Sequence, residues 1–366
     1  MHDSHTEERE PLPPLARSAH LMHVKRALAQ LPGQQVSLDS SRMSIIFYCI
    51  GTMDLLGVLH QETTEMDRAS WRSWVWEQYT GGSFGAGFRP GPFMSTNSPT
   101  PLLAPHIIMT YTALLCLALL RDDFTRLSRS GLAHFVKSCQ KADGSFSAMP
   151  FGVGDCDLRN LYCAFGICAL LKSWSSINVE RAVAYIASCR TYEGGYGQTP
   201  GAEAHGGTTY LAIAALQMVT HSSRPRLSPS EKDRTIYWLV HNQDASGGFR
   251  GRTGKMPDAC YCFWGGGALQ ILGEQDKVDA YAFVNFISAC QFSYGGIAKA
   301  PGQYPDPYHT YLALAAAAMY TPLLSTSALA YGHNGWNVLA VGPFNPLFNA
   351  REEVVQWARQ HIPCRL

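Results

Sequence analysis

A glycine-rich turn that recurs along the chain constrains the fold more than any other feature of the sequence. Each copy follows a polar residue and ends on an aromatic or apolar one, at Phe146, Tyr196, Phe249 and Ile297. These positions lie about 50 residues apart, a period typical of repeat architectures whose unit cannot bury its apolar face alone. The repeats therefore predict one domain of stacked units, although a chain of 366 residues is long enough for two domains.

Two kinds of helical pattern alternate between these turns. Amphipathic helices that stop just before the glycines are expected at 127–140, 179–190, 236–243 and 278–291. Helices that are apolar nearly all round, as fully buried helices are, are expected at 107–120, 158–171, 208–218, 261–272 and 309–319. An outer ring of amphipathic helices around an inner ring of buried helices is an all-α fold, the α/α barrel.

The boundaries of this barrel follow from composition. Residues 1–20 are expected to be disordered, and residues 21–366 are expected to form a single barrel domain. Stretches dense in Gly, Pro, Ser and Thr predict long loops near 81–105 and 322–349, and a last short helix is expected from Ala350 to about His361.

Charge and hydropathy exclude several classes of protein. The formal net charge is +1, which argues against a nucleic-acid binder, because such proteins need clustered Lys and Arg. Only 16% of the residues are charged, so part of the surface is expected to meet a partner. The apolar runs at 107–120 and 311–319 are shorter than the roughly 20 residues that cross a bilayer. No signal-peptide core follows Met1–Glu10, so we expect a cytoplasmic protein whose 11 cysteines stay reduced.

The densest group of chemically reactive residues lies in two neighbouring repeats. Asp258 and Cys260 precede one buried helix, and His309 opens the next buried helix about 50 residues later. Equivalent positions of adjacent inner helices lie side by side, so these three side chains are expected to converge at one rim. Carboxylate, thiolate and imidazole form a zinc set, and three ligands leave the fourth position open, as in catalytic sites. From the residues alone the alternative stays open, because Asp-x-Cys is a short pattern in a chain with 11 Cys and 13 His.

A second group points to an anion. Arg252 and Lys255 lie in the loop before the proposed zinc helix, Tyr261 follows, and His205 opens the buried helix of the preceding repeat. Cationic side chains beside helix N-termini can bind a diphosphate, because free backbone N–H groups add to the side-chain charge. Taken in isolation, Arg252 and Lys255 are more commonly a solvated turn.

These residues together resemble the β subunits of protein prenyltransferases. The matching motifs are 251–264, His205-Gly206-Gly207 and 307–309, and the repeat pattern covers 41–320. The resemblance implies that one zinc ion is held by Asp258, Cys260 and His309. It implies that diphosphate is bound by His205, Arg252, Lys255 and Tyr261. It implies that Arg159, Tyr162 and Trp264 line the wall of the central funnel, where they contact the lipid or the peptide.

Within that family the chain looks most like the type I geranylgeranyl branch. The segment 106–112 resembles that branch. Ser44 ends a Ser-Arg-Met-Ser segment that resembles the Ser-Arg-Pro-Trp segment of the farnesyl branch, and a small residue in place of the Trp leaves room for a longer lipid. Lys299 stands where the farnesyl and Rab branches carry an Asp associated with magnesium. A fixed ammonium can replace that ion, so magnesium is not expected to be required, and Lys299 joins the expected catalytic residues. Tyr308 departs from the pattern, because it resembles the farnesyl branch at a position near the last residue of the substrate tail.

The resemblance implies an activity and partners. We expect transfer of geranylgeranyl from its diphosphate to the cysteine of C-terminal CaaX tails, mainly those ending in Leu, on small GTPases. The family acts as a heterodimer with a helical α subunit.

Alternative functions remain open at this point. They are a protein farnesyltransferase or Rab geranylgeranyltransferase β subunit, a triterpene cyclase and a non-enzymatic helical scaffold. A triterpene cyclase uses a motif resembling Asp-x-Asp-Asp, and 155–158 is the nearest approach, without the final Asp.

Overall fold

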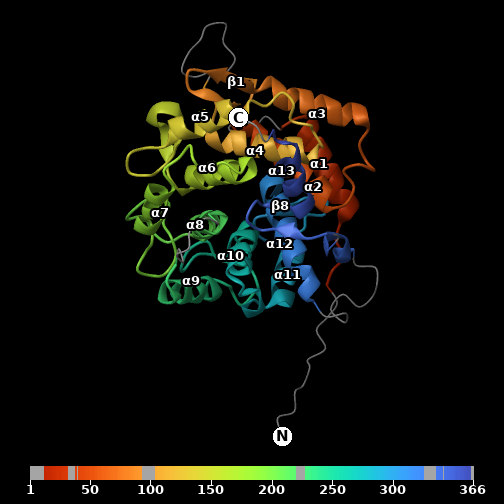
Figure 1. Ribbon diagram of the computed structural model, residues 1–366. Coiled ribbons are helices and arrows are strands. Elements are labelled where there is room, and N and C mark those ends of the chain that lie inside the picture. The colour runs from red at the N-terminus through yellow and green to blue at the C-terminus, as the bar shows by residue number, and fades with distance from the viewer. Residues whose placement is uncertain are drawn as a thin grey trace.

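The computed structural model describes residues 12–31, 38, 40–92, 104–219, 227–324, 335–340 and 342–363, and these residues form an α/α barrel (Figure 1). Each inner helix of the described chain contacts the next one, and the last contacts the first, so the ring is closed. The inner helices are α2 (Arg42–Leu55), α4 (Ile107–Leu119), α6 (Leu158–Leu171), α8 (Gly206–Met218), α10 (Ala259–Leu272) and α12 (Pro307–Tyr320).

The outer helices bury one face each, as their amphipathic patterns require. They are α1 (Arg17–Ala29), α3 (Glu65–Glu77), α5 (Arg129–Cys139), α7 (Val179–Ser188), α9 (Pro229–His241) and α11 (Ala280–Ala289). The predicted inner and outer helices are all present, most with ends within two residues of the prediction. The exception is α9, which begins at Pro229 and not near residue 236, because its first turns are polar and start at a Ser228–Glu231 capping box.

The recurring glycine turns lock each repeat unit to the next outer helix. Gly85, Gly144, Gly194, Gly247 and Gly295 all have positive φ angles. A Cβ atom at Gly247 would lie 2.0 Å from the carbonyl oxygen of Ala282 in α11, and one at Gly295 would lie 1.9 Å from that of Ala19 in α1. Only glycine combines this backbone angle with such close approach, which explains why the turn repeats.

The start of the chain completes the ring. Helix α1 takes the place of the next outer helix beside Gly295, and the side chain of Gln291 bonds to it, accepting from the backbone N–H of Ala16 at 2.8 Å. Gln140 and Gln243 make the same kind of bond to the N-caps of α7 and α11. The expectation of disorder to residue 20 is therefore wrong for residues 12–20, while residues 1–11 lie outside the described residues.

Short hairpins and turns occupy parts of the stretches expected to be loops. In 81–105 the structure has the hairpin of β1 (Tyr79–Gly82) and β2 (Gly85–Phe88), and 93–103 lie outside the described residues. In 322–349 it has η6 (Thr321–Leu323), η7 (Trp336–Ala340) and β7 (Phe344–Asn345), and 325–334 and 341 lie outside them. The remaining short elements are β3 (Ser147–Met149), η4 (Pro150–Gly152), β4 (Val153–Cys156), η5 (Gln275–Lys277), β5 (Ile297–Ala298), β6 (Pro305–Asp306) and β8 (Ala350–Arg351). The last helix, α13 (Glu352–His361), matches the prediction and packs on α4 and α6.

Four tyrosines, here called the tyrosine ring, occupy the same place in four inner helices. Tyr111, Tyr162, Tyr210 and Tyr311 are each the fifth residue of their helix, and all are at most 5% exposed. Their hydroxyls donate to the backbone carbonyls of Phe348, Leu347, Pro346 and Asn349, at 2.9, 2.9, 2.6 and 2.6 Å. The tyrosine ring thus holds four consecutive residues of the C-terminal segment.

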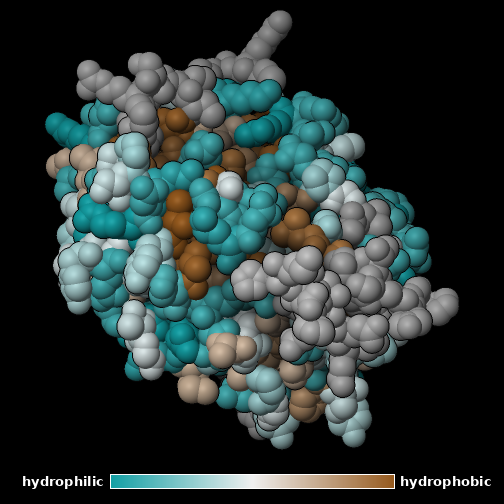
Figure 2. Space-filling model, turned by 90° about the horizontal axis from the view of Figure 1, so that it is seen from below, coloured by the Kyte–Doolittle hydropathy of each residue, from teal (hydrophilic) through white to brown (hydrophobic). Residues whose placement is uncertain are grey.

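The surface is mostly hydrophilic on the face shown in Figure 2, with apolar residues visible as narrow patches between hydrophilic ones. Among the described helices, none has the length and hydropathy needed to span a membrane.

Candidate functional site

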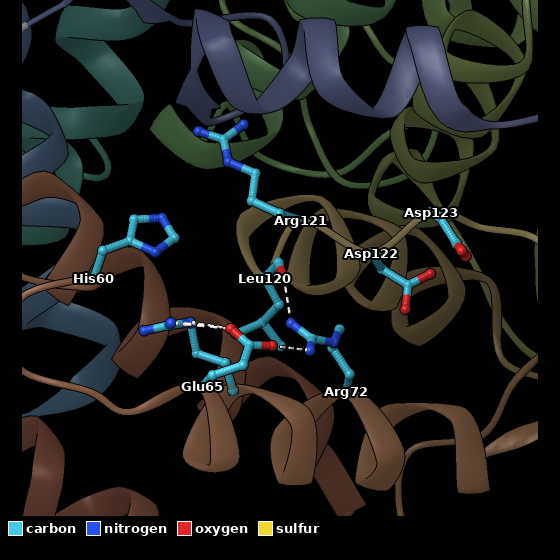
Figure 3. Close-up of a pocket in the computed structure, with 8 residues that line it drawn as sticks. His60, Glu65, Arg72, Leu120, Arg121, Asp122 and Asp123 are labelled. Atoms are coloured by element: carbon cyan, nitrogen blue, oxygen red, sulfur yellow. Dashed lines mark hydrogen bonds and ion pairs between the residues drawn. The ribbon is translucent and has the colours of Figure 1, made fainter.

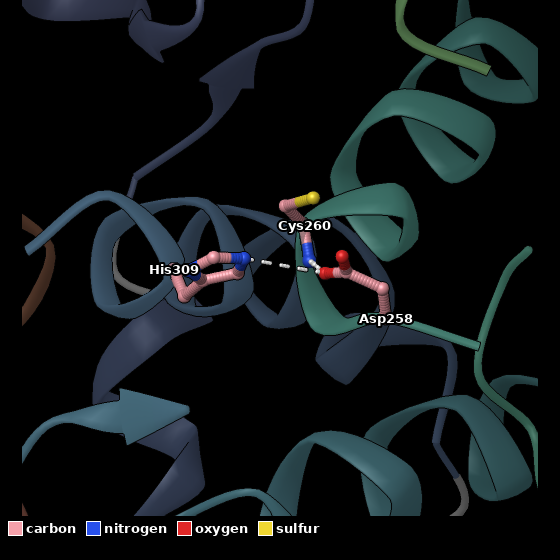
Figure 4. Close-up of side chains that lie close together, drawn as sticks. All are labelled: Asp258, Cys260 and His309. Carbon is pink, nitrogen blue, oxygen red and sulfur yellow. Dashed lines mark hydrogen bonds and ion pairs between the residues drawn. The ribbon is translucent and has the colours of Figure 1, made fainter. Parts of the chain in front are cut away.

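Asp258, Cys260 and His309 come together where α10 and α12 begin, as the repeat spacing predicted (Figure 4). Asp258 caps α10 by accepting a hydrogen bond from the backbone N–H of Cys260 at 2.9 Å. The Nε2 atom of His309 lies 3.4 Å from Oδ1 of Asp258, and one ligand atom from each residue lies within 4.8 Å of the others. Asp258 and Cys260 are 6% and 4% exposed, so most of this group of three residues, here called the metal cluster because its ligand atoms could share one ion, is buried.

The cluster fits a zinc ion. Zinc binds nitrogen and oxygen at about 2.0–2.1 Å in a tetrahedron, so two such ligand atoms lie about 3.3 Å apart, close to the His309–Asp258 separation. The donor set of one thiol, one imidazole and one carboxyl is typical of zinc, and three ligands leave a fourth position open.

Asp306 orients the histidine, a role that the sequence pattern did not predict. It caps α12 by accepting from the backbone N–H of His309 at 2.9 Å, and its other oxygen lies 2.6 Å from Nδ1 of His309. This bond fixes the imidazole so that Nε2 faces Asp258, the usual outer-shell arrangement of metal-binding histidines. A carboxylate three residues before the histidine was the available signal.

The pKa values of the cluster show how the side chains share protons. Burial raises the pKa of Cys260 to about 12. Burial alone would lower the pKa of His309, but its hydrogen bonds with Asp258 and Asp306 outweigh burial and raise that pKa to about 11. Burial acts to raise the pKa of Asp258, yet the hydrogen bonds with His309 and Cys260 lower it. Without a metal the three groups are therefore held by a shared proton network, and metal binding must release protons.

His205 and Tyr261 form a second polar pair, which joins the start of α8 to the start of the neighbouring helix α10. His205 caps α8, and its Nδ1 accepts from the backbone N–H of Gly207 at 3.2 Å. Its Nε2 lies 2.9 Å from the Tyr261 hydroxyl. Because Nδ1 is an acceptor, Nε2 carries the proton and donates it to the hydroxyl oxygen, which leaves the Tyr261 proton free for a further acceptor. Burial and then Arg252 lower the pKa of His205, which favours this neutral form.

The loop with Arg252 and Lys255 is tied to the same helix start. The backbone N–H of Gly206 donates to the carbonyl of Gly251 at 2.8 Å. Arg252 forms an ion pair with Glu203 at 3.0 Å, a partner that the sequence analysis did not identify. Lys255 is exposed. The structure thus places Arg252 next to His205 and Tyr261.

Lys299 and Tyr308 lie beside the metal cluster, and Trp264 contacts Tyr308. The carbonyl of Lys299 accepts from the backbone N–H of Ala259, between Asp258 and Cys260, while its side chain is exposed. Trp264 donates through Nε1 to the Tyr308 hydroxyl at 3.1 Å, and the Tyr308 ring meets the His309 ring edge-on at 4.9 Å.

The other expected site residues lie on inner helices further around the ring. Arg159 pairs with Asp155 and Asp157 at the start of α6, at 2.8 and 2.6 Å. Tyr162 belongs to the tyrosine ring. Ser44 is half-buried on α2, with its hydroxyl 3.6 Å from the sulfur of Met109.

A charged pocket of about 350 Å³ lies elsewhere, beside α3 (Figure 3). Its guanidinium groups are already paired, because Glu65 bonds to both Arg68 and Arg72 and the carbonyl of Leu120 accepts from Arg72 at 2.8 Å. None of the expected site residues lines this pocket.

Comparisons with known proteins agree with this arrangement. The model of the prenyltransferase alpha-alpha toroid domain matches residues 15–350. The geranylgeranyl transferase type-1 subunit beta of Arabidopsis thaliana is 33% identical over 81% of this chain and 82% of its own length. That of Dictyostelium discoideum is 36% identical over 79% and 86%. A solved structure of Candida albicans protein geranylgeranyltransferase-I complexed with GGPP aligns with a TM-score of 0.81 and 25% identity, over 96% of this chain and 100% of that one.

The match spans most of the barrel, and both relatives are covered over more than two thirds of their length. The chain therefore belongs to the prenyltransferase alpha-alpha toroid family, in which its relatives include type-1 geranylgeranyl transferase β subunits.

Proposed function

We propose that this chain is the catalytic β subunit of a type I protein geranylgeranyltransferase. It acts with a helical α subunit and transfers geranylgeranyl from its diphosphate to the cysteine of CaaX tails of small GTPases, mainly tails that end in Leu. The observation that carries the proposal is the position of two groups at one rim: the metal cluster at the start of α10 and α12, and the His205–Tyr261–Arg252 group beside it.

The metal cluster is proposed to hold one zinc ion through Asp258, Cys260 and His309. When bound there, zinc supplies the lowering of a substrate thiol pKa that yields the nucleophilic thiolate. Asp306 keeps the His309 ring oriented, and the near-complete burial of Asp258 and Cys260 keeps water away from the ligands. The exposed ammonium of Lys299, beside this helix start, is proposed to provide the charge that a magnesium ion would otherwise supply.

The second group is suited to the leaving diphosphate. As the thiolate sulfur bonds to C1 of the lipid, the C–O bond to diphosphate breaks and negative charge grows on that oxygen. The free proton of Tyr261 and the guanidinium of Arg252 can donate to it, with Lys255 able to approach from the exposed loop. Donors that are already oriented before the reaction are the most effective stabilisers of developing charge.

The lipid choice rests on the small side chain of Ser44 and on the relatives' names. The second candidate is farnesyl transfer, favoured by Tyr308, which the Trp264 hydrogen bond fixes beside His309. Triterpene cyclisation gains no support from the site, because 155–158 lacks the final Asp of the motif and its two carboxylates are both paired with Arg159. A cytoplasmic location stays a prediction.

A transfer assay with the αβ complex tests the proposal. Farnesyl and geranylgeranyl diphosphates are compared on peptides that end in Leu, Ser or Met, and zinc is counted in the purified complex. We expect one zinc per chain and faster geranylgeranyl transfer to the Leu peptide. Faster farnesyl transfer would reject the branch, and absence of zinc would reject the mechanism.

A single substitution tests the lipid choice more narrowly. We expect Ser44→Trp to shift the preference toward farnesyl diphosphate, because the indole fills the space of the longer lipid. Ser44→Thr, which stays small, is the matched control, and an unchanged preference in Ser44→Trp would show that Ser44 does not set chain length.

A further inference from the structure

We propose that a small pocket at the end of α2 is a binding site for a neutral molecule that carries a primary carboxamide or urea group. Two oppositely charged side chains in this pocket, here called the Asp54–Arg351 pair, are mostly buried and leave most of their hydrogen-bonding capacity unused within the described chain. The inference goes beyond the proposed function and does not depend on it.

The pocket lies far from the metal cluster. The metal cluster forms where the inner helices α10 and α12 begin, whereas Asp54 lies in the last turn of α2. The inner helices are equivalent units of one repeat, so all of them begin at one rim of the barrel and end at the other. An α-helix rises about 1.5 Å per residue, so the 14 residues of α2 separate the two rims by about 20 Å. A small molecule in this pocket therefore cannot touch the metal cluster.

The pocket has the size of a small-molecule site. Its volume is about 380 Å³, within the range of roughly 300–1,000 Å³ that is usual for such sites. Leu59 and Pro343 contribute apolar walls, and Gly57 and Gly342 bring no side chain that would fill the space. His60 lines both this pocket and the neighbouring one of Figure 3.

Arg351 supplies hydrogen-bond donors to the pocket. The residue is 6% exposed, and its Nη2 atom donates to the carbonyl of Leu55 at 2.9 Å. Its Nε atom is buried and has no hydrogen-bond partner in the described chain. Its Nη1 atom faces Gly342, where a Cβ atom would lie 3.4 Å away. A buried guanidinium with unused N–H groups costs stability unless a further acceptor reaches it.

Asp54 supplies the matching acceptor. Its side chain is 12% exposed, and its Oδ2 atom lies 3.4 Å from Nε of Arg351, an ion pair that makes no hydrogen bond. Within the described residues, no group donates a hydrogen bond to this carboxylate. Burial raises the pKa of Asp54 to about 6, although Arg351 acts to lower it, so the carboxylate is ionised at neutral pH.

The charges around the pocket cancel, which selects a neutral ligand. Asp54 faces Arg351, and Glu353 is paired with Arg121 at 3.0 Å. Burial and neighbouring arginines lower the pKa of His60, so its ring is neutral as well. An anion would be repelled by Asp54 and a cation by Arg351. A carboxamide instead offers an N–H to the carboxylate and, beside it, a carbonyl oxygen to the guanidinium.

Three probes of the same shape and different charge test this inference. Benzamide is neutral, benzoate is an anion and benzamidine is a cation, and their dissociation constants for the full chain are measured by ligand-detected NMR titration. We expect benzamide to bind at least about tenfold more tightly than the other two, the lower end for one hydrogen bond to a charged group. Equal affinities, tighter binding of either charged probe, or no binding of benzamide would overturn the proposal.

A substitution locates the binding. Asp54→Asn removes the negative charge and keeps the shape of the side chain, so Arg351 then favours an anion. We expect benzoate to gain on benzamide by about 10- to 100-fold in this variant. Asp123→Asn is the matched control, because Asp123 lines only the neighbouring pocket of Figure 3, and it should leave the ratio at the wild-type value. An unchanged ratio in Asp54→Asn would place the probe elsewhere and reject the site.

Hydrogen exchange on the wild-type protein gives a readout that needs no variant, and it decides the question if Asp54→Asn does not fold. Saturating benzamide should slow amide exchange in the peptides that contain 54–61 and 342–353, the two segments that line the pocket. Protection of other peptides without any change in these two segments would contradict the site.

Discussion

At the rim of the barrel, the side chains of Asp258, Cys260 and His309 bond to one another, and burial together with these bonds raises the pKa values of Cys260 and His309 but lowers that of Asp258. Further along the inner helices, the tyrosine ring buries four hydroxyl groups, but each hydroxyl donates to its own backbone carbonyl. Burial raises the pKa of all four tyrosines well above the usual value, so they remain donors. The difference teaches that one region is built to exchange a ligand and the other to hold a segment.

The largest expected effect is the loss of zinc binding and transfer when a ligand is removed from the metal cluster, a loss that substitutions in the tyrosine ring should not cause. Cys260→Ala removes one ligand, and we expect zinc affinity and transfer to fall by more than about 100-fold, the upper end for outer-shell partners. Zinc content and kcat/KM are the measurements. Cys262→Ala is the matched control, because it is buried on the same helix and lies outside the cluster. If both variants keep zinc, Cys260 is not a ligand and the comparison fails.

The next effect concerns the orientation of the histidine. Asp306→Asn keeps the helix cap, because Asn caps as well as Asp, but loses the charge opposite Nδ1 of His309. We expect zinc affinity to fall by about 10- to 100-fold, measured by competition with a chelator. Asp279→Asn, at the cap of α11, should bind zinc as the wild type does. Equal affinities in the two variants would limit Asp306 to a capping role.

A third prediction addresses the tyrosine ring. Tyr311→Phe leaves the carbonyl of Asn349 without its donor, and we expect the free energy of unfolding to fall by about 1–3 kcal/mol. Chemical denaturation of the metal-free protein measures this. Tyr237→Phe, at a residue that is 65% exposed, should leave stability unchanged. A stable Tyr311→Phe variant would show that the segment is held by packing alone.

The smallest expected effect concerns His20, a buried histidine of α1 where that helix closes the ring against the last glycine turn. His20 accepts at Nδ1 from the backbone N–H of Gly296 and donates from Nε2 to Gln291, so a second proton would face an N–H group. Burial lowers its pKa to about 4, below the ordinary value of 6.5. Its contribution to stability is therefore complete above pH 6.5 and is lost as the pH falls toward 4.

Between pH 7 and pH 5.5 this loss amounts to about 1 kcal/mol for a shift of that size. Denaturation curves at the two pH values measure it, and His20→Gln should remove this part of the pH dependence. The same slope in His20→Gln would assign the effect to other groups.

Much of the fold could be predicted because the repeats carry strong local signals. Glycine turns and apolar helices fixed the two rings, and one repeat of separation brought Asp258, Cys260 and His309 together. The closure of the ring could not be predicted, because α1 lacks the glycine turn and its partner Gln291 lies 275 residues from Ala16. The attachment of the tyrosine ring to 346–349 could not be predicted either, because the tyrosines bond to backbone carbonyls, which any residue supplies. Asp306 and Glu203 were missed because their role depends on which neighbouring group they face.

Helix α1, the first outer helix in the sequence, packs against the glycine turn of the last repeat at Gly295. The repeats therefore form a continuous circle that the chain ends interrupt only in sequence. A ribosome must release most of the polypeptide before Gly295 can meet Ala19, so the ring closes late and through a contact between residues far apart in sequence, which is slow to form. A circular permutant with fresh ends between α8 and α9 and a linker joining the old ones would move the late, long-range closing contact from Gly295 and Ala19 to the new ends.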